Sequence, residues 1–403
     1  MVPGASRGRW YKVREVVIVD AVRTPTGKRN GALSGLRPDD TLGKLIYHLI
    51  TERLGIDPSM VEDFICGCVT QIGEQGLNIA RNALLVGGFP TSIPGVAVNR
   101  LGGSSLQAII LAAQVIASGE MDIVLAGGVE FMSRQPMGSD GFGDHISHLG
   151  SGVSPRLFER FGALVSQGIS AEMMAEKRGF GRQELDDYAR RSNELATAAM
   201  DSGLYAGEIM PMEVTTPEGK TRIVKYDEGP RRGSSLEEIV FMKPAYKADG
   251  IVTTANSGQI ADGAAAVLLI SEEKCSELRL TPKARYLGST ITAEDPLDML
   301  TGPITATQRL LARTGLNIDE IDVFEVNESF AAVPLAWIKE LNPPKPKRIN
   351  PWGGAIANGN PLGASGAKLT CTLLSELEHM QGRFGLQAMG MGMGVAVIYE
   401  RIS

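Results

Sequence analysis

The sequence predicts an α/β protein with a helix-covered parallel sheet, built from two halves that follow a similar plan. One observation is a β-branched run over residues 16–22 that ends at Thr24-Pro25, which is typical of a buried strand followed by a turn. Another is the order strand, glycine-rich turn, apolar helix and strand over residues 96–126. That order is a βαβ unit, whose sheet is normally covered on both faces.

The first half can be followed element by element. Helical spacing predicts a helix over residues 41–54, and residues 64–69 predict a second strand. A strand at 96–98 then runs into the turn Gly102-Gly103, a long apolar helix follows over 105–117, and a strand returns at 123–126. Glycine pairs of this kind mark tight turns and crowded sites.

The middle of the chain, residues 130–247, has a different character. Residues 132–168 are rich in glycine, serine and proline, and residues 219–233 are polar and charged. Between them, residues 186–200 form an amphipathic helical pattern with mixed charges. This predicts an inserted domain or a long excursion whose helices are exposed on one side.

The second half repeats the strand-and-turn pattern from residue 252 onward. The small-residue segment 263–266 permits close packing, and the later elements are a strand at 323–326, a helix at 327–339, a loop at 354–361, a helix at 364–380 and a strand at 394–400. Each half therefore has a strand that feeds a glycine-rich turn before a long apolar helix. This indicates an internal duplication, although α/β units resemble one another in general.

Composition narrows the class of protein. A chain of 403 residues suits two or three domains, and 43% apolar with 21% charged residues is ordinary for a globular protein. The net charge of −6 does not fit a nucleic-acid binder. We found no run of about 18 apolar residues and no secretory h-region, and predict a disordered arm over residues 1–14. The four cysteines fit buried reduced thiols in a cytoplasmic protein.

Several segments, taken together and in order, resemble the degradative 3-oxoacyl-CoA branch of the thiolase family. The resemblance runs from about residue 16 to the end of the chain. It rests on residues 19–25 (VDAVRTP), 73–81, 127–133, 227–231, 262–266, 326–331 (VNESFA) and 350–357. Each segment alone is a weak signal, whereas their common order is specific.

The resemblance implies a five-layered αβαβα fold with two duplicated halves. It places an N-terminal half at 15–130 and 249–273, a loop domain at 131–248 near the coenzyme A moiety, and a C-terminal half at 274–403. It also implies a homodimer or tetramer. The expected ligand is a coenzyme A thioester, with no covalently bound cofactor and no metal.

The positions of the family's titrating groups carry other residues here. The nucleophilic cysteine, which follows Asn-Arg-Leu, falls on Gly102, and the histidine of the Gly-His-Pro loop falls on Asn360. The second cysteine, from the Cys-x-Gly motif, aligns with Ala388. Glycine cannot form an acyl-enzyme, and asparagine does not titrate. The resemblance therefore implies a thiolase fold without the side chains for ordinary thiolysis.

An oxyanion-binding frame is expected to remain. Asn327 and the backbone N–H groups at Gly102, Asn360 and Gly390 are positioned by the resemblance to bind a thioester carbonyl. Glu328 is the only acid in its motif, and we expect it to be structural.

The resemblance also names residues that should contact the coenzyme. They are Arg231, Ser257, Gly258, where the family has a serine at the pantetheine arm, and Gln167, which with Gly168 replaces a Met-Gly pair. If these alignments hold, the pocket has changed as well as the chemistry.

Substitute catalytic groups are weakly indicated. Ser104 and Ser105 follow the lost nucleophile, but serines at a helix start usually cap it. His145 and His148 lie in the loop excursion, where a mobile or contact-forming loop is the plainer interpretation than a metal site. His48 and His379 fall in helical stretches.

Three hypotheses follow. The first is a non-thiolytic homologue that binds an acyl-CoA or supports a partner subunit, such as an active thiolase paralogue. The second is retro-aldol cleavage of a β-hydroxyacyl-CoA, which some cysteine-less branches of the superfamily perform with a small zinc-containing OB-fold partner. The third is an engineered inactive 3-oxoacyl-CoA thiolase (acetyl-CoA C-acyltransferase), ranked last because glycine at 102 and 258 is not a usual engineered choice. No nucleic-acid or membrane partner is expected.

Overall fold

The protein is organised around one mixed sheet of ten strands. The computed structural model describes residues 13–402 apart from 143–147, 149, 163 and 217. Along the sheet the strands run in the order β10 (Val323–Val326), β11 (Phe384–Gly390), β12 (Gly394–Arg401), β9 (Ala284–Ile291), β1 (Val16–Arg23), β8 (Ala261–Ser271), β5 (Ile123–Phe131), β3 (Asp63–Gly67) and β4 (Gly95–Val98). The two-residue strand β2 (Gly27–Lys28) pairs with β8.

Strand direction corrects the expectation of a parallel sheet. The pairs β3–β4, β3–β5 and β10–β11 are parallel, as the βαβ order predicted. However, β8 runs antiparallel to both β1 and β5, and β12 runs antiparallel to both β9 and β11. Long excursions and hairpins, rather than single crossover helices, connect these strands, and such connections allow antiparallel neighbours.

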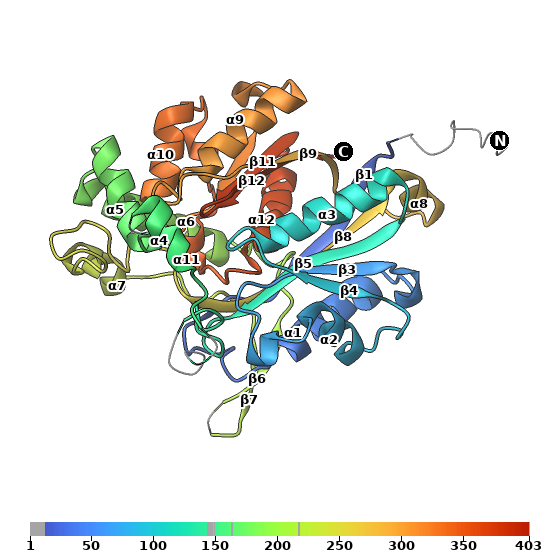
Figure 1. Ribbon diagram of the computed structural model, residues 1–403. Helices are drawn as coiled ribbons and strands as arrows, with labels where there is room; N and C mark the ends of the chain where they lie inside the picture. The colour runs from blue at the N-terminus through green and yellow to red at the C-terminus, as the bar shows by residue number, and fades with distance from the viewer. Residues whose placement is uncertain (1–12, 143–147, 149, 163, 217, 403) are drawn as a thin grey trace.

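Helices form three layers, and the two halves of the sheet separate them (Figure 1). The outer layers are α1 (Pro38–Tyr47) with α2 (Ile79–Val86) on the first half, and α9 (Gly302–Thr314) with α10 (Ala332–Leu341) on the second. Between the halves lie α3 (Ser104–Ser118) and α12 (Ser365–His379). A separate apolar cluster fills each helix–sheet contact. The predicted five-layered αβαβα fold is therefore confirmed.

Burial on both sides explains the apolar character of α3. Its side chains pack on both sheet halves and on α12. Residues 101–118 form the one helical stretch of the described chain that is long and apolar enough, by length and composition, to cross a membrane, and 67% of it is buried inside the protein. This helix includes Ser104, Ser105 and Gln107, so it is not an unbroken apolar run, and it is apolar because a fully enclosed core helix needs no polar face.

The excursion between β5 and β8 carries α4 (Pro155–Phe161), α5 (Gln167–Arg178), α6 (Arg182–Asp201), the hairpin β6 (Met212–Thr215) and β7 (Thr221–Val224), and α7 (Ser234–Glu237). Figure 1 shows α4, α5 and α7 beside the second half, while the hairpin projects at the bottom. The long helix α6 buries one face, including Leu185 and Tyr188, and exposes its charged face. The predicted amphipathic pattern is thus confirmed for this helix.

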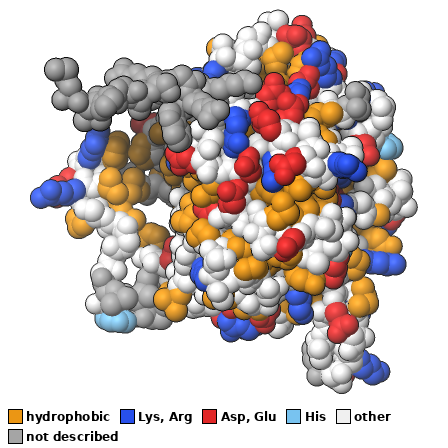
Figure 2. Space-filling view, turned by 90° about the vertical axis from the view of Figure 1, so that its right-hand side faces the viewer, with side chains coloured by type: hydrophobic (Ala, Val, Ile, Leu, Met, Phe, Trp, Pro, Cys, Tyr) orange, Lys and Arg blue, Asp and Glu red, His pale blue; other side chains and the backbone are white. Residues whose placement is uncertain are grey.

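Charged side chains are spread over the visible surface rather than gathered in one patch. On the face in Figure 2, acidic and basic side chains are interspersed with apolar ones, and no continuous basic area crosses it. The four cysteines are buried and free. Burial raises the pKa of the thiols of Cys66, Cys68 and Cys371, so these groups are not poised as nucleophiles.

Candidate active site

The turn before α3 is held in a strained shape, and an empty space lies in front of it. Leu101 has a φ of +49°, which a branched side chain rarely adopts. The side chain of Asn99 holds this turn, because its Oδ1 accepts from the backbone N–H of Leu101 at 2.9 Å and its Nδ2 donates to the carbonyl of Val69 at 3.0 Å. A Cβ at the next residue, Gly102, would meet no described atom within 4 Å. The predicted nucleophile position is therefore a buried backbone with room for a side chain.

The two serines after this turn are used by the backbone. Ser104 Oγ accepts from the N–H of Arg100 at 2.9 Å and donates to the carbonyl of Leu101 at 2.6 Å. Ser105 Oγ accepts from the N–H of Ala367 at 2.9 Å, which ties the start of α3 to the start of α12. Both hydroxyls therefore stabilise the turn and the helix junction, and neither has a basic partner.

Asn360 lies at the start of the segment that leads into α12. Its N–H donates to the carbonyl of Gln259 at 2.9 Å, and its Oδ1 accepts from Ser365 Oγ at 2.7 Å. The preceding Gly359 has a φ of +83°, and its carbonyl accepts from Lys368 Nζ at 3.1 Å. This loop is thus fixed from both sides, with an amide where a proton acceptor was expected.

Asn327 carries an unused polar atom. The residue is 6% exposed, and its Oδ1 is buried without a hydrogen-bond partner among the described residues. Its backbone N–H donates to the carbonyl of Ala388 at 3.0 Å, which fixes where the side chain starts. A buried amide oxygen without a partner is unfavourable, so a water molecule or a ligand group is expected to complete it.

The neighbouring Glu328 is fully engaged. Its carboxylate accepts from Tyr188 Oη at 3.0 Å, Asn350 Nδ2 at 2.9 Å, Ser192 Oγ at 2.6 Å and the N–H of Ile356 at 3.1 Å. Four donors, two from α6 and two from residues 350–356, make this acid a structural anchor for the loop before α12. The expectation of a structural Glu328 fits this geometry, and the geometry leaves no lone pair aimed at a substrate.

The β11–β12 turn contains the other sequence-predicted residues. Ala388 is fully buried, and its side chain belongs to the apolar cluster under α9 and α10. Gly390 has a φ of +147°, and a Cβ there would overlap the carbonyl oxygen of Met393. After this glycine, Met391 and Gly392 reach the cavity described next. Neither Gly390 nor Ala388 is among the residues that line the cavity, and the carbonyl of Ala388 accepts from the N–H of Asn327.

A large cavity lies between the excursion and the second half, next to this turn. Its volume is about 680 Å³, which is within the range of small-molecule sites. Leu101, from the turn before α3, forms part of its wall. The wall is mostly apolar and includes Phe142, Phe158, Tyr246, Met299, Phe330 and Met391.

The predicted coenzyme-contacting residues divide into two groups. Gln167 and Gly168 line the cavity, and the ring of Tyr246 packs so closely on Gly168 that a Cβ there would overlap it. Ser257 and Gly258 lie beside the cavity wall. Ser257 forms an isolated β-bridge with Phe330, which lines the cavity, and the N–H of Gly258 donates to the carbonyl of Ser329 at 2.9 Å. The hydroxyl of Ser257 already donates to the carbonyl of Thr253 at 2.6 Å.

Arg231 is not among the residues that line the cavity. Its backbone N–H donates to Asn193 Oδ1 at 2.8 Å, which fixes the segment between β7 and α7. The structure thus brings Gln167 to the cavity and leaves Arg231 outside its lining.

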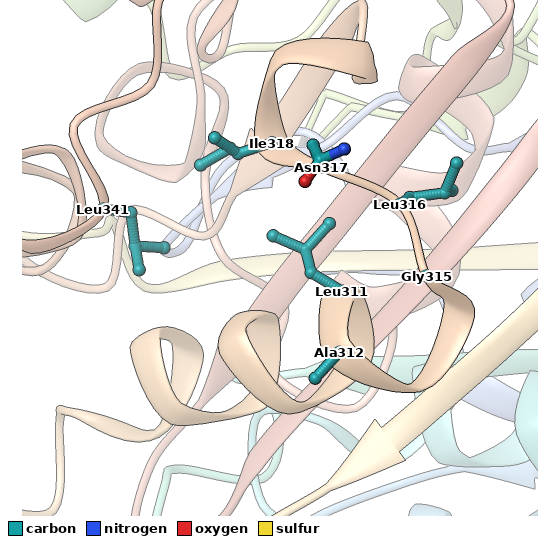
Figure 3. Close-up of a pocket in the computed structure, with 7 residues that line it drawn as sticks. All are labelled: Leu311, Ala312, Gly315, Leu316, Asn317, Ile318 and Leu341. Atoms are coloured by element: carbon teal, nitrogen blue, oxygen red, sulfur yellow. The ribbon is translucent and has the colours of Figure 1, made fainter.

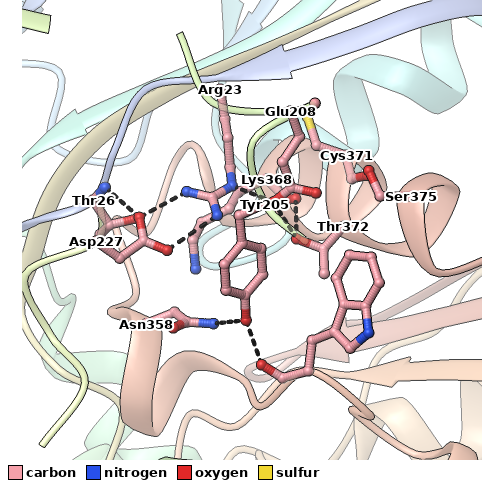
Figure 4. A network of polar contacts seen from close by, with 12 residues as sticks. Arg23, Thr26, Tyr205, Glu208, Asp227, Asn358, Lys368, Cys371, Thr372 and Ser375 are labelled. Atoms are coloured by element: carbon pink, nitrogen blue, oxygen red, sulfur yellow. Dashed lines mark hydrogen bonds and ion pairs between the residues drawn. The ribbon is translucent and has the colours of Figure 1, made fainter. Parts of the chain in front are cut away.

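A buried network of charged side chains, which was not predicted from the sequence, lies behind the site (Figure 4). Arg23 binds Asp227 with two hydrogen bonds of 2.7 and 3.0 Å and Glu208 with one of 2.6 Å. Burial alone would raise the pKa of Asp227, but Arg23 and Lys368 hold it below its ordinary value. Burial and the positive charge of Arg23 lower the pKa of Lys368 to about 8. The network joins residues far apart in the sequence, so no local motif signals it.

No described histidine lines the cavity. His145 lies outside the described residues, and His148 is exposed. His48 Nδ1 contacts Glu52 at 2.6 Å, and His379 packs edge-on against Trp352. Over the described part of the chain, no group of three His, Cys, Asp or Glu side chains could hold a metal ion.

A second hollow, of about 390 Å³, lies at the surface near the end of α9 (Figure 3). Its wall is made by the last turn of α9, the segment that follows, and the end of α10, and it contains no ionisable side chain. The larger cavity, which reaches the turn before α3, is therefore the candidate active site.

Comparisons with known proteins identify the family. The sequence matches the family "Thiolase, N-terminal domain" over residues 16–273 and "Thiolase, C-terminal domain" over residues 280–401. It is 45% identical to the steroid 3-ketoacyl-CoA thiolase FadA6 of Mycobacterium tuberculosis, covering 100% of this chain and 98% of that protein. It is 41% identical to a beta-ketoadipyl-CoA thiolase of Pseudomonas aeruginosa, covering 96% and 100%.

A solved structure shares the whole fold. The crystal structure of the Bacillus anthracis acetyl-CoA acetyltransferase superposes with a TM-score of 0.88 at 33% identity, covering 97% of this chain and 100% of that one. Both domain matches and the full-length relatives lead to the same conclusion: the chain belongs to the thiolase family.

Proposed function

We propose that this protein binds the thioester of an acyl-coenzyme A in the 680 Å³ cavity without forming an acyl-enzyme. The observation that carries the proposal is the glycine at residue 102, at the N-terminal turn of α3 that borders the cavity. A family thiolase needs a thiolate there, and a hydrogen atom cannot accept an acyl group. The relatives named above are thiolases that act on acyl-CoA esters, which supports a role in acyl-CoA metabolism.

A second part of the proposal concerns the other titrating groups. Asn360 occupies the histidine position, and its amide cannot take a proton from a thiol. The second cysteine position is Ala388, whose methyl group cannot exchange a proton. Its backbone carbonyl accepts from the N–H of Asn327 at 3.0 Å, so this position is adjacent to the backbone of Asn327.

The polar groups that remain at the site favour a protein that still binds a ligand. The unpartnered Oδ1 of Asn327 supplies an acceptor, and the backbone N–H of Gly102, next to Leu101 of the cavity wall, supplies a donor. The N–H groups of Gly103 and Ser104 already donate to the carbonyls of Arg100 and Leu101. Donors at a helix N-terminus carry positive potential, which suits a polarised thioester oxygen. The ligand is held non-covalently in this arrangement.

The same frame supports a second candidate, retro-aldol cleavage of a β-hydroxyacyl-CoA. That reaction needs enolate stabilisation and a base but no acyl-enzyme. Glu328 does not serve as the base, because its carboxylate already accepts four hydrogen bonds. A partner subunit, such as a zinc-containing OB-fold protein, would have to supply it.

Two assays test these proposals. Purified protein with a 3-oxoacyl-CoA and free coenzyme A should release no acetyl-CoA, intact-mass analysis should find no acyl adduct, and calorimetry should detect coenzyme A ester binding. Turnover at ordinary enzymatic rates would overturn the main proposal. Aldehyde or ketone release from a β-hydroxyacyl-CoA, alone or with a candidate partner, would select the second.

We also propose a homodimer, with pairing of dimers into tetramers as the alternative. The edge strand β4 and the segment just before α2 expose apolar side chains, including Leu77 at 94% and Val96 at 43% exposure. An open apolar edge of this kind favours pairing with another chain. Light scattering that returns a monomer of 43.0 kDa would contradict this.

A further inference from the structure

The wall of the cavity has one charged side chain among the described residues that form it. That residue is Glu294, and the other contributors are apolar, aromatic or uncharged polar residues. No described lysine or arginine lines the cavity. Arg100, which is close in the sequence to the catalytic turn, directs its guanidinium toward Met393 Sδ at 3.4 Å instead.

Glu294 is held at a fixed place beside the reacting end. Its N–H donates to the carbonyl of Gly392 at 3.0 Å, and its Oε1 accepts from Thr292 Oγ1 at 3.0 Å. Gly392 itself lines the cavity together with Met391. A negative charge is therefore fixed in the wall, close to the β11–β12 turn.

The reacting end of the cavity is also wide. A Cβ would meet no described atom within 4 Å at Gly102 or at Gly392. Both glycines border the same cavity region, one after Leu101 and one after Met391. Side chains at these positions would narrow the space beside the thioester, and here that space is open.

Resting on the proposed function, we infer that the acyl group of the ligand is neutral and apolar, and carries a branch or a ring close to the thioester. An acyl chain that ends in a carboxylate is excluded. A terminal carboxylate would leave water for an apolar wall that offers it no cation and one like charge, which is unfavourable. A ring beside the thioester would fill the open space and gain the apolar burial that a linear chain leaves unused.

Three coenzyme A esters with the same number of acyl carbons test this directly. They are heptanoyl-CoA, cyclohexanecarbonyl-CoA and pimeloyl-CoA, and calorimetry on the full chain gives the dissociation constants. We expect the cyclic ester to bind more tightly than the linear one, by about fivefold, since one extra buried methylene-sized contact contributes roughly 1 kcal/mol. Pimeloyl-CoA should bind at least about tenfold more weakly than heptanoyl-CoA.

Charge reversal sharpens the test. Glu294→Lys should improve the affinity for pimeloyl-CoA by about tenfold or more and change heptanoyl-CoA binding little. Glu273→Lys, which makes the same charge change on the exposed face of α8 (Glu272–Glu277), is the matched control and should alter neither affinity. An improvement with both variants would indicate a long-range charge effect and overturn the assignment of Glu294.

Filling the open space tests the ring. Gly102→Val should weaken cyclohexanecarbonyl-CoA by about tenfold while acetyl-CoA binding changes little. Gly35→Val is the control, because Gly35 is exposed, is not among the cavity-lining residues and also has nothing within 4 Å of a Cβ. If heptanoyl-CoA binds as tightly as the cyclic ester, or pimeloyl-CoA as tightly as heptanoyl-CoA, the inference is wrong. If no ester and no free coenzyme A binds, the proposed function itself fails.

Discussion

The wall behind the site and the surface that faces the cavity differ in what their polar groups bind. Behind the site, buried side chains bind one another: Arg23 binds two carboxylates, and Glu328 accepts four hydrogen bonds. At the site, Gly102 faces open space and Asn327 keeps an unpartnered oxygen. On the proposed function, the fold depends on the first region, and the family architecture is kept without the reactive groups of the second.

The largest effect is expected in the wall. Arg23→Met leaves Asp227 and Glu208 as buried carboxylates without their cation, and such a loss reduces stability by about 3–5 kcal/mol. Urea unfolding at a fixed protein concentration measures it. Arg285→Met is the control, because Arg285 pairs with carboxylates at the surface and should lose less than about 1 kcal/mol. Equal losses of stability in the two variants would mean that the buried network of Arg23 contributes no more than the surface ion pairs of Arg285.

A smaller effect separates the two glycines of the site. Gly390→Ala forces a Cβ onto the carbonyl oxygen of Met393 and keeps a φ of +147°, so we expect a loss of about 2–4 kcal/mol. Gly102→Ala meets no described atom within 4 Å and should change stability by less than about 1 kcal/mol. Both values come from thermal or urea unfolding. A tolerant Gly390→Ala variant would show that the β11–β12 turn can relax.

Local patterns predicted the elements that bury one continuous apolar surface. The expected strand, turn and helix around residues 96–126 are β4, α3 and β5, and the expected final helix is α12. The expected helix at 327–339 starts late, as α10 at Ala332, because Asn327 and Glu328 turn their side chains to the site and to its supporting network. Strands β9 and β11 were missed, since their pairing comes from distant segments.

The site was predictable from motifs only in part. Gln167 lines the cavity and Gly102 follows Leu101 of its wall, whereas Asn360 binds Ser365 in the loop before α12 and is not among the lining residues. Ala388 was assigned from the Cys-x-Gly motif, and the structure places its side chain in an apolar cluster and its carbonyl on the N–H of Asn327. The Arg23 network joins residues more than 180 positions apart in the sequence, so no local pattern contains it.

A pH dependence is expected from the wall. Burial lowers the folded-state pKa of Lys368 from 10.5 to about 8, so between these pH values the unfolded chain binds more protons than the folded one. Stability should therefore rise with pH across that window, and the contribution should be flat below it. The gain relative to Lys368→Met should be on the order of 1–3 kcal/mol, measured by unfolding at a series of pH values. A difference that stays constant from pH 7 to 10 would contradict the lowered pKa.

The smallest structural change is expected to have the clearest chemical readout. Gly102→Cys places a thiol in open space at the N-terminus of α3, where the helix potential favours the thiolate. It should alter stability by less than about 1 kcal/mol and react with iodoacetamide under native conditions, whereas the four native cysteines are buried and should not. Peptide mapping by mass spectrometry identifies the modified residue. Thiolysis should still be absent, because Asn360 takes no proton, and should appear slowly when Asn360→His is added. Full thiolysis by Gly102→Cys alone would show that the cavity already holds a base, and an unreactive thiol would show that the space before α3 is closed in solution.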